Sequence, residues 1–456
     1  MDVKFPESKA WVKTMDQKPP LSGSVRTFWW IFAVTALFKL VLSAVVPLTG
    51  DEAYFVIWGR HLDYGYYDHG AMTGWVLWLA LLLGQSCWIV RLPAVVASLL
   101  VGLMLRRSLQ PLGSDKANLA AALFLLSPVN FLTFFFTTDT PLLFFSAVAV
   151  FLGVRAVRRE SLLDWFASGL FLGMAFLSKY FAVLLGISFA VALIGCGVSR
   201  RRGLGMVALA AGVLPAAILN IAWNVNHSWV NILFNVYNRN SDAGFDLLAV
   251  PLLFLLVAVL VGPSLMFRLL RRRSPGRISW RALWGELQQS GLTVCLTALV
   301  VPLAILLFVS PLQSVGLHWL ISFVPFFFPV LAVAFGAEDL RDMLKGAKRY
   351  AAGIAGVLAL LAFLPPEGAI LGMRRVAGIV GGTHGEERVD TLWQKHGGSV
   401  VIGVYADELL QEVEPFRKDY LLTSRSYSQA ALLAFCDRTY VPVLGRGSYH
   451  GRQDDL

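Results

Sequence analysis

The chain alternates between long apolar runs and short polar stretches over most of its length. Eleven apolar runs predict membrane-spanning helices, because a helix needs about 20 residues to cross a hydrocarbon core of roughly 30 Å. The predicted spans are residues 28–48, 88–105, 119–136, 139–154, 164–178, 180–198, 204–223, 247–267, 291–309, 319–336 and 350–365. The pattern predicts an all-α polytopic membrane protein with about 11 to 13 transmembrane helices.

Composition supports this prediction and excludes other classes of protein. Of the 456 residues, 57% are hydrophobic and 15% are charged, whereas soluble domains carry about 25% charged residues. Four cysteines are too few for a disulfide scaffold, and most of them lie in apolar runs, which indicates small core residues. The high apolar fraction also excludes an intrinsically disordered chain.

The net charge is +10, and the positions of the basic residues indicate the orientation of the chain in the membrane. Basic residues cluster between predicted spans, at Arg106–Arg107, Arg155–Arg159, Arg200–Arg202, Arg268–Arg281 and Arg341–Arg349. Short cytoplasmic loops carry such an excess of Lys and Arg. Residues 1–27 form a polar segment without an apparent cleavable signal peptide, so we expect this segment to stay in the cytoplasm. The charge therefore indicates topology, and nucleic acid is not an expected partner.

One shorter apolar run, residues 71–84, tests this orientation. Counted as a full span, it would move Arg106 and Arg107 to the outer face and invert every later loop. As a helix it would rise only about 21 Å. We therefore predict a juxtamembrane or re-entrant helix within the first outer loop, residues 49–87, where it packs on protein or lines a cavity.

The composition changes after Pro365 and Pro366. Residues 399–405 and 439–444 have the short β-branched runs of strands, and a Leu-rich stretch at 428–435 is typical of a helix. We predict a transmembrane domain at residues 28–365 and a small α/β domain at 366–456 on the outer face.

Polar residues next to the spans gather on the outer face, where chemistry is expected because charges are costly in lipid. Asp51 and Glu52 follow the first span, and paired carboxylates can act as a general base or bind a metal. Asp139 stands between two spans, and Lys179 occupies a short turn where a cation suits a lipid phosphate. Structural interpretations stay open: a solvated loop start for the first pair, a helix cap for Asp139 and a snorkelling side chain for Lys179.

The longest outer loop, residues 224–246, combines amides, aromatic rings and cations of the kind that bind sugar or phosphate. It contains Asn224, His227 and Arg239. His318 opens a later span beside Trp319; this is typical of an interface residue, but the imidazole can also donate a hydrogen bond to phosphate or sugar. The chain has no Walker A, GxGxxG, HExxH, CxxC or GxSxG motif, which disfavours a cytosolic nucleotide site.

Several short motifs follow one another along the chain. They are Asp51-Glu52-Ala53-Tyr54 with Trp58, Gly65-Tyr66-Tyr67-Asp68-His69, Arg91-Leu92-Pro93, Thr138-Asp139-Thr140-Pro141-Leu142, Leu177-Ser178-Lys179-Tyr180, Trp223-Asn224 with His227, His318-Trp319 and Tyr405-Ala406-Asp407-Glu408. In this order they resemble the bacterial polyprenyl-phosphate-dependent glycosyltransferases of the GT-C type, which include the lipid A aminoarabinose transferases and are related to protein O-mannosyltransferases. The resemblance runs from residue 28 to the end. It departs from the family after His69, where Gly70 and Ala71 replace two frequent prolines.

The resemblance implies a GT-C fold and an integral membrane glycosyltransferase. The enzyme would transfer a hexose or pentose, with inversion, from a polyprenyl-phosphate donor to a glycolipid such as lipid A, the lipopolysaccharide core or a related envelope glycan. The active site would face the periplasm from the bacterial inner membrane. Asp51 would be the general base on the acceptor hydroxyl, Lys179 would bind the donor phosphate, and Asp139 would position the substrate or the neighbouring loop. The candidate residues are, for catalysis, Asp51, Glu52 and Asp139; for the donor phosphate, Lys179, Arg60, Tyr180 and His318; and for the substrate, Tyr54, Tyr66, Asp68, His69, Asn224, His227 and Arg239.

The sequence requires no cofactor. Asp51, Asp68 and His69 are suitable ligands for a divalent metal, but their spacing does not demand one. The expected partners are the lipid-linked sugar donor, the lipid or glycolipid acceptor and membrane lipids. Two alternatives stay open: a protein O-glycosyltransferase, and a transporter or flippase of lipid-linked sugars, although transporters usually show related halves and charges near the midplane.

Overall fold

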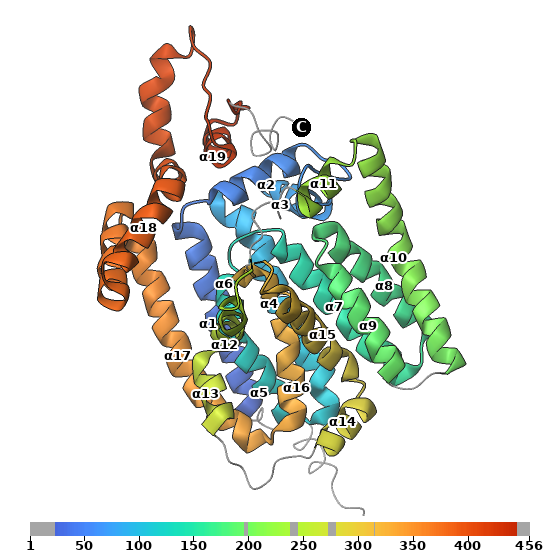
Figure 1. Cartoon of the computed structure of the whole chain (residues 1–456). Coiled ribbons are helices and arrows are strands. Elements are labelled where there is room, and N and C mark those ends of the chain that lie inside the picture. Colours follow the sequence, from blue (N-terminus) through green and yellow to red (C-terminus); the bar gives the residue numbers. More distant parts are fainter. Residues whose placement is uncertain (1–22, 196–198, 238–244, 272–279, 314, 445–456) are drawn as a thin grey trace, which may run out of the picture.

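The computed structural model describes residues 23–195, 199–237, 245–271, 280–313 and 315–444, and this part of the chain is helical (Figure 1). The first helices are α1 (Gly23–Val45), α2 (Gly50–Arg60), α3 (Met72–Leu81), α4 (Cys87–Leu109), α5 (Ser114–Leu125), α6 (Pro128–Leu132), α7 (Asp139–Arg159), α8 (Leu162–Ser178) and α9 (Ala182–Gly195). They are followed by α10 (Arg200–Asn226), α11 (Val230–Val236), α12 (Ala249–Val261), α13 (Pro263–Arg271), α14 (Trp280–Gln289), α15 (Thr293–Val309), α16 (Phe327–Ala334), α17 (Ala337–Phe363), α18 (Pro366–Val413) and α19 (Tyr427–Asp437). Short 3₁₀ helices are η1 (Gln110–Leu112), η3 (Leu317–Leu320), η4 (Val324–Phe326) and η5 (Glu414–Phe416).

The long apolar helices confirm a multi-pass membrane protein. Five of them, α1, α4, α7, α10 and α17, are individually long and apolar enough to cross a membrane. Two helix pairs pass the same test as bent segments: α12 with α13, bent by 107°, and α14 with α15, bent by 120°. Shorter apolar helices include α3, α8, α9 and the segment Val324–Ala334. The predicted spans fall mainly on helices, while the number of membrane crossings stays a prediction.

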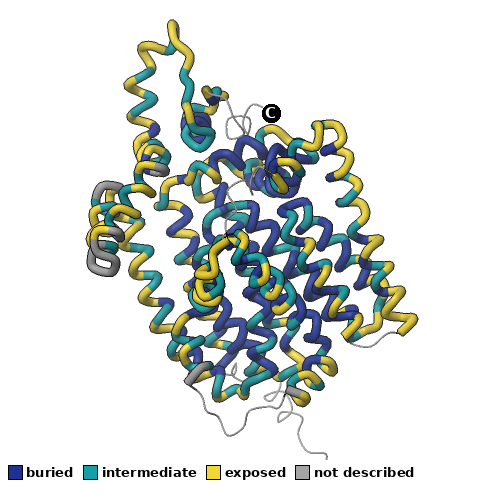
Figure 2. Tube along the Cα trace, viewed as in Figure 1, coloured by how far each residue is buried: buried dark blue, intermediate teal, exposed yellow. Residues whose placement is uncertain are grey.

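Small residues bring helices of the bundle close together. A Cβ atom at Gly169 of α8 would lie 2.0 Å from the carbonyl oxygen of Leu209 in α10, and one at Gly212 would lie 2.2 Å from that of Phe166. Only glycine therefore allows the two backbones to approach this closely, a packing mode common between membrane helices. Figure 2 shows buried residues concentrated inside the bundle and exposed ones along the outer sides of α10 and α17.

The predicted short helix of the first outer loop is present as α3. It has 10 residues and packs against α2, α4 and α8. Helices α2 and α3 lie together at one end of the bundle, near α11 and α19 (Figure 1). Because that end follows α1 in the chain, the predicted orientation places it outside the cytoplasm.

The C-terminal segment differs from the prediction. Residues 399–405, predicted as a strand, lie inside α18, and an α/β description of residues 366–444 is wrong. The helix formers that follow, from Ala406 to Leu410, continue the helix through the β-branched run. The predicted helix at 428–435 is confirmed as α19, whereas the run 439–444 contributes only a single bridge between Val443 and Ser424. The predicted domain boundaries stay predictions.

Candidate functional site

One cavity at the α2 end of the bundle gathers five residues that the sequence singled out. The cavity has a volume of about 400 Å³. Its titratable lining residues are Asp51, His69, Asp139, Lys179 and His318. They come from α2, the turn before α3, the start of α7, the turn between α8 and α9, and η3. Five separate stretches of sequence therefore meet at one polar site.

The cavity wall also contains residues that sequence reasoning missed. Thr133, Thr137, Thr138 and Thr140 line it, together with Phe135. Hydroxyl groups can donate hydrogen bonds to phosphate or sugar oxygens. The signal in the sequence was the density of threonine between two apolar runs, in the same turn that supplies Asp139.

Asp139 and Lys179 form a buried ion pair in this cavity. The Lys179 Nζ lies 2.9 Å from Oδ1 and 3.0 Å from Oδ2 of Asp139. The two side chains are 7% and 5% exposed, so neither charge is solvated as a surface charge would be. Asp139 is the first residue of α7 and Lys179 ends α8 in extended backbone. This geometry excludes a lysine that snorkels to solvent, and the cap residue of α7 is Thr138, not Asp139.

Asp51 stands between this cavity and a second one. It lies in the first turn of α2, its side chain is exposed, and its Oδ1 accepts a 2.8 Å hydrogen bond from the Tyr427 hydroxyl of α19. The second cavity also has a volume of about 400 Å³. Val46, Leu48, Phe135, Val400 and Val404 give it an apolar wall, and Asp51 and Phe135 line both cavities. The Asp51 carboxylate is therefore accessible from a polar side and from an apolar side.

Glu52, predicted as catalytic beside Asp51, has a structural position instead. Its side chain is fully buried, and its two oxygens accept hydrogen bonds of 2.7 Å each from Nε and Nη2 of Arg91. The same carboxylate accepts from the backbone N–H groups of Thr49 and Phe136, at 3.0 Å each. Glu52 thus joins α2, α4 and the turn before α7. It is not among the residues that line the cavity, so the predicted catalytic role is not supported.

Two predicted phosphate ligands also lie elsewhere. Arg60 is nine residues beyond Asp51 on α2, which separates the two by about 13 Å along the helix axis. Its guanidinium donates to the carbonyl of Ala434 and to Gln85. The hydroxyl of Tyr180 donates to Asn231 Oδ1 at 2.5 Å. Neither residue is among those that line the cavity, and the phosphate-binding roles of Arg60 and Tyr180 stay predictions.

The aromatic residues of the first outer loop are packed and do not face the cavity. Tyr54 and Tyr66 are buried, and the Tyr66 ring stacks on Trp58 with ring centroids 4.4 Å apart. The Tyr66 hydroxyl donates to the Trp58 carbonyl oxygen at 2.9 Å, and burial raises the pKa of this phenol to about 12. Asp68 is buried beside them. The stack fixes the turn that contains His69. Tyr54, Tyr66 and Asp68 therefore stabilise the turn and do not line the cavity.

The predicted substrate residues of the α10–α11 region are likewise outside the cavity. Asn224 is fully buried; its side chain donates to the Asn220 carbonyl at 2.9 Å and accepts from the backbone N–H of Ile232. His227 stacks on Trp223, with ring centroids 4.0 Å apart. These contacts shape the turn into α11. Arg239 lies outside the described residues.

Lys39 is a second buried cation near the cavity, and sequence reasoning missed it. It lies within α1, has no exposed surface, and its Nζ donates to Ser98 Oγ, to the carbonyl and side-chain oxygens of Asn130, and to Thr133 Oγ1 at 3.2 Å. The Ser98 and Thr133 hydroxyls each donate their own hydrogen to a backbone carbonyl, so they can only accept from Lys39. Four acceptors and no donor indicate a charged ammonium group. Thr133 both accepts from Lys39 and lines the cavity.

Metal ligands do not cluster in the described part of the chain. No group of three or more His, Cys, Asp or Glu residues there could hold a metal ion. Asp51, Asp68 and His69, which the sequence offered as ligands, do not form such a group.

Comparison with known proteins gives a consistent result. Residues 68–223 match the family model of dolichyl-phosphate-mannose-protein mannosyltransferases. A lipid A galacturonosyltransferase, RgtD of Rhizobium johnstonii, is 27% identical over 239 residues, which cover 50% of this chain and 50% of that protein. The chain thus matches about half the length of this curated relative. The structure is similar to that of ArnT from Cupriavidus metallidurans bound to undecaprenyl phosphate, with a TM-score of 0.62, 16% identity, and coverage of 99% of this chain and 89% of ArnT.

These matches support the resemblance to polyprenyl-phosphate-dependent glycosyltransferases of the GT-C type. The likeness to ArnT extends over nearly the whole chain and confirms the predicted GT-C fold. The region that matches the family model includes His69, Asp139 and Lys179, while Asp51 precedes it and His318 follows it. The cavity is therefore assembled from inside and outside the matched region.

Proposed function

We propose that this GT-C protein transfers a sugar from a polyprenyl-phosphate donor to a lipid or glycolipid acceptor, such as lipid A or another envelope glycan, on the periplasmic face of the bacterial inner membrane. Asp51 is the general base and the anomeric carbon is inverted. The observation that carries this proposal is the position of Asp51, which borders both the polar cavity that contains the Asp139–Lys179 ion pair and the apolar cavity.

The two cavities suit the two substrates. Lys179, His69 and His318 offer charge and hydrogen-bond donors to a phosphate and a sugar in the polar cavity. The second cavity, with Val46, Leu48, Val400 and Val404 in its wall, suits the hydrocarbon part of an amphiphilic acceptor. The acceptor hydroxyl would then meet the anomeric carbon beside Asp51.

The reaction balances without a further reactant. Asp51 takes the proton of the acceptor hydroxyl, the oxygen forms a bond to the anomeric carbon, and the bond from that carbon to the phosphate oxygen breaks with its electron pair on the phosphate. Attack opposite to the leaving group inverts the configuration. The products are the glycosylated acceptor and polyprenyl phosphate. No step requires a nucleotide.

Lys179 and Lys39 interact with the phosphate in different ways. Lys179 contacts the leaving phosphate directly and stabilises it as its charge grows, with Asp139 fixing the position of the ammonium group. Lys39 attracts the phosphate electrostatically without contacting it, because Thr133 lies between them. A buried positive charge without a carboxylate partner is stabilised by a nearby anion. Its acceptors in the described structure are all uncharged oxygens.

The acceptor class distinguishes this proposal from its alternative. A protein O-glycosyltransferase would use the same donor cavity, and the apolar wall of the second cavity favours a lipid acceptor over a hydrophilic peptide. The partial likeness to RgtD, a lipid A galacturonosyltransferase, supports the same choice.

The activity is tested with the purified full-length protein in lipid nanodiscs. Polyprenyl phosphates carrying a hexuronic acid, an aminopentose or a hexose are offered with lipid A, with a core glycolipid or with a Ser- and Thr-containing peptide, and released polyprenyl phosphate is measured by mass spectrometry. We expect release with one donor and a lipid acceptor, and a loss of at least a thousandfold in Asp51→Asn. Asp246→Asn, an exposed residue of the same face, is the matched control. Glycosylation of the peptide alone, or full turnover by Asp51→Asn, contradicts the proposal.

The orientation has its own test. A cysteine at Ser228, exposed at the end of α10, should react with a membrane-impermeant maleimide from the periplasm, in a background without the exposed Cys436. A cysteine at Ser114, at the start of α5, should react only after the inner membrane is opened. The reverse pattern overturns the topology.

A further inference from the structure

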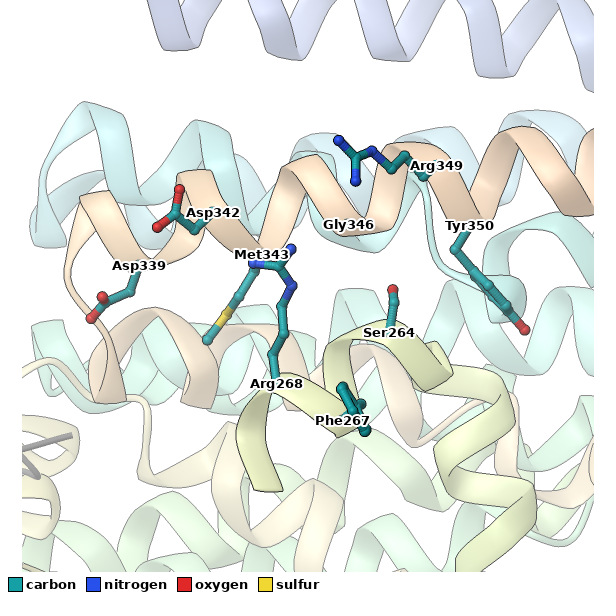
Figure 3. A pocket seen from close by; sticks show the side chains of 9 residues that line it. All are labelled: Ser264, Phe267, Arg268, Asp339, Asp342, Met343, Gly346, Arg349 and Tyr350. Atoms are coloured by element: carbon teal, nitrogen blue, oxygen red, sulfur yellow. The ribbon is translucent and has the colours of Figure 1, made fainter. Parts of the chain in front are cut away.

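A large pocket lies far from the candidate site, between α13 and the first half of α17. Its volume is about 740 Å³. Charged and hydroxyl-bearing side chains from both helices line it: Ser264, Arg268, Asp339, Asp342, Arg349 and Tyr350 (Figure 3). Both helix segments lie at the end of the bundle that the predicted orientation places in the cytoplasm. The pocket takes no part in the reaction proposed above.

The predicted topology puts this pocket near the cytoplasmic membrane interface. The chain bends by 107° between α12 and α13, at Gly262, whose φ of +114° is unfavourable for residues with a side chain. The bend turns α13 away from the direction of α12, with Leu265 in the core and Phe267 51% exposed. A short amphipathic helix of this kind lies in the interface plane, where lipid headgroups are the nearest ligands.

Two arginines in the pocket are available to a ligand. Within the part of the chain that the structure describes, neither the Arg268 nor the Arg349 guanidinium has an ion-pair or hydrogen-bond partner. Arg268 is half-buried against Gly346 of α17, where a Cβ atom would lie 3.0 Å from its Nε. The absence of a side chain at 346 therefore lets the guanidinium lie along α17 and point into the pocket, as Figure 3 shows. Arginine binds phosphate oxygens through two parallel donors.

The pocket also carries negative charge at its other end. Figure 3 shows Asp339 and Asp342 on one side of Arg268, and Arg349, Ser264 and Tyr350 on the other. Asp342 also pairs with Lys345 at 3.0 Å. A purely anionic ligand would meet these carboxylates, while a ligand with a phosphate and a neighbouring ammonium group would complement both ends.

We propose that the pocket between α13 and α17 binds a zwitterionic phospholipid headgroup of the phosphoethanolamine class from the cytoplasmic leaflet. Arg268 and Arg349 hold the phosphate, and Asp339 and Asp342 face the primary ammonium group. Ser264 and Tyr350 supply hydroxyl donors at the phosphate end, and the acyl chains leave past Phe267 into the membrane.

Native mass spectrometry of the delipidated full-length protein tests this proposal. Phosphatidylethanolamine, phosphatidylglycerol and phosphatidylcholine with the same acyl chains are titrated separately, and soluble phosphoethanolamine and inorganic phosphate serve as competitors. We expect the ethanolamine lipid to bind most tightly, because only its headgroup combines a phosphate with an ammonium group that can donate hydrogen bonds. Tighter binding of the glycerol lipid overturns the proposal. Equal competition by soluble phosphoethanolamine overturns the assignment to a lipid.

Variants locate the binding site. Arg268→Gln and Arg349→Gln should each weaken binding of the ethanolamine lipid about tenfold or more, since each removes a charge-assisted contact. Lys348→Gln, an exposed neighbour outside the pocket, is the matched control and should bind as the unchanged protein does. Gly346→Leu keeps both arginines but fills the space beside Arg268, and the same loss is expected. Unchanged binding by all three pocket variants, at unchanged thermal stability, overturns the proposal.

Variants of Asp339 and Asp342 test the preference for the ethanolamine headgroup separately. Asp339→Asn with Asp342→Asn should reverse the preference, so that the glycerol lipid binds at least as well as the ethanolamine lipid. A preference that survives the double change contradicts the role of these residues at the ammonium group.

Discussion

The hydroxyl of Tyr427 donates a 2.8 Å hydrogen bond to Oδ1 of Asp51, across 376 positions of the chain. Through this contact α19, which packs on α2, reaches the carboxylate that borders both cavities. The C-terminal segment is therefore part of the site and not an appendage. The Tyr427 hydroxyl holds one carboxylate oxygen of Asp51 in place.

Tyr427→Phe should lower turnover about ten- to a hundredfold, because hydrogen bonds to charged groups contribute about 1.5–3 kcal/mol. The fold should be unaffected, since the ring still packs edge-on against Tyr54. Released polyprenyl phosphate is the measurement, and Tyr420→Phe, an exposed tyrosine of the same segment, is the control. Equal turnover of the two variants would show that the contact does not position Asp51.

The Asp139–Lys179 pair predicts different results for its two members. Lys179→Met should weaken binding of undecaprenyl phosphate strongly, because it removes the cation that faces the cavity. Asp139→Asn should destabilise the ligand-free protein by about 3–5 kcal/mol, since it leaves a buried ammonium group without its counter-charge. Undecaprenyl phosphate should then raise the unfolding temperature of Asp139→Asn by more than it raises that of the unchanged protein.

The double variant Lys179→Met with Asp139→Asn is the control for this pair. It should recover most of the lost stability without recovering phosphate binding. Stabilities of the two single variants that simply add in the double variant would contradict a coupled buried pair.

Asp51 and Glu52 are neighbours with opposite expected phenotypes. Glu52→Gln should lower the stability of the protein by about 3–5 kcal/mol, because it leaves the fully buried Arg91 without a carboxylate. Asp51→Asn should unfold at the same temperature as the unchanged protein while losing turnover, because its side chain is exposed. Thermal unfolding followed by intrinsic fluorescence distinguishes the two, and a stable, inactive Glu52→Gln would return the catalytic role to Glu52.

Placement of charges on one face was sufficient to find the titratable residues of the polar cavity. Asp51, His69, Asp139, Lys179 and His318 were all selected because they lie next to apolar runs on the predicted outer side, and one cavity contains them. The rule works because charge is costly in lipid, so polar groups beside spans collect where water or a ligand can reach them. The roles assigned to these residues stay proposals.

The placement of charges along the chain did not predict the direction in which each side chain points. Adjacent helical residues point about 100° apart, so Glu52 turns inward to Arg91 while Asp51 faces the cavities. Arg60 follows on the same helix but contacts Ala434, a partner 374 positions away that no local pattern reveals. The strand expected at 399–405 failed for a similar reason, because β-branched residues also suit a helix whose neighbours favour it.

Lys39 did carry a signal in the sequence, as a charge in the middle of the first apolar run. Two unit charges about 7 Å apart in a medium of effective dielectric constant of about 20 interact by about 2 kcal/mol. Lys39→Met should therefore weaken undecaprenyl phosphate binding about ten- to thirtyfold. Ser98→Ala keeps the ammonium group, removes one of its acceptors, and should change the affinity less than about threefold. Similar losses in both variants, measured by thermal shift against ligand concentration, would indicate a purely structural lysine.

Acid should detach the C-terminal segment from the site before the helical bundle unfolds. Arg417, just after η5, donates to both oxygens of Asp437 at the end of α19, at 2.5 and 2.6 Å, and these hydrogen bonds hold the pKa of Asp437 below its usual value of 3.8. A lowered pKa means that the pair stabilises the folded segment above that value and that this contribution is lost as the pH falls through the lower folded value. Protection of the α19 amides from hydrogen exchange, relative to the intrinsic rate at each pH, should therefore fall below about pH 4, together with loss of the Tyr427–Asp51 contact and of turnover. Asp437→Asn should show the faster exchange already at pH 7, whereas Asp419→Asn, an exposed acid of the same segment, should not. Protection of α19 that is independent of pH in the unchanged protein would mean that other contacts hold the segment in place.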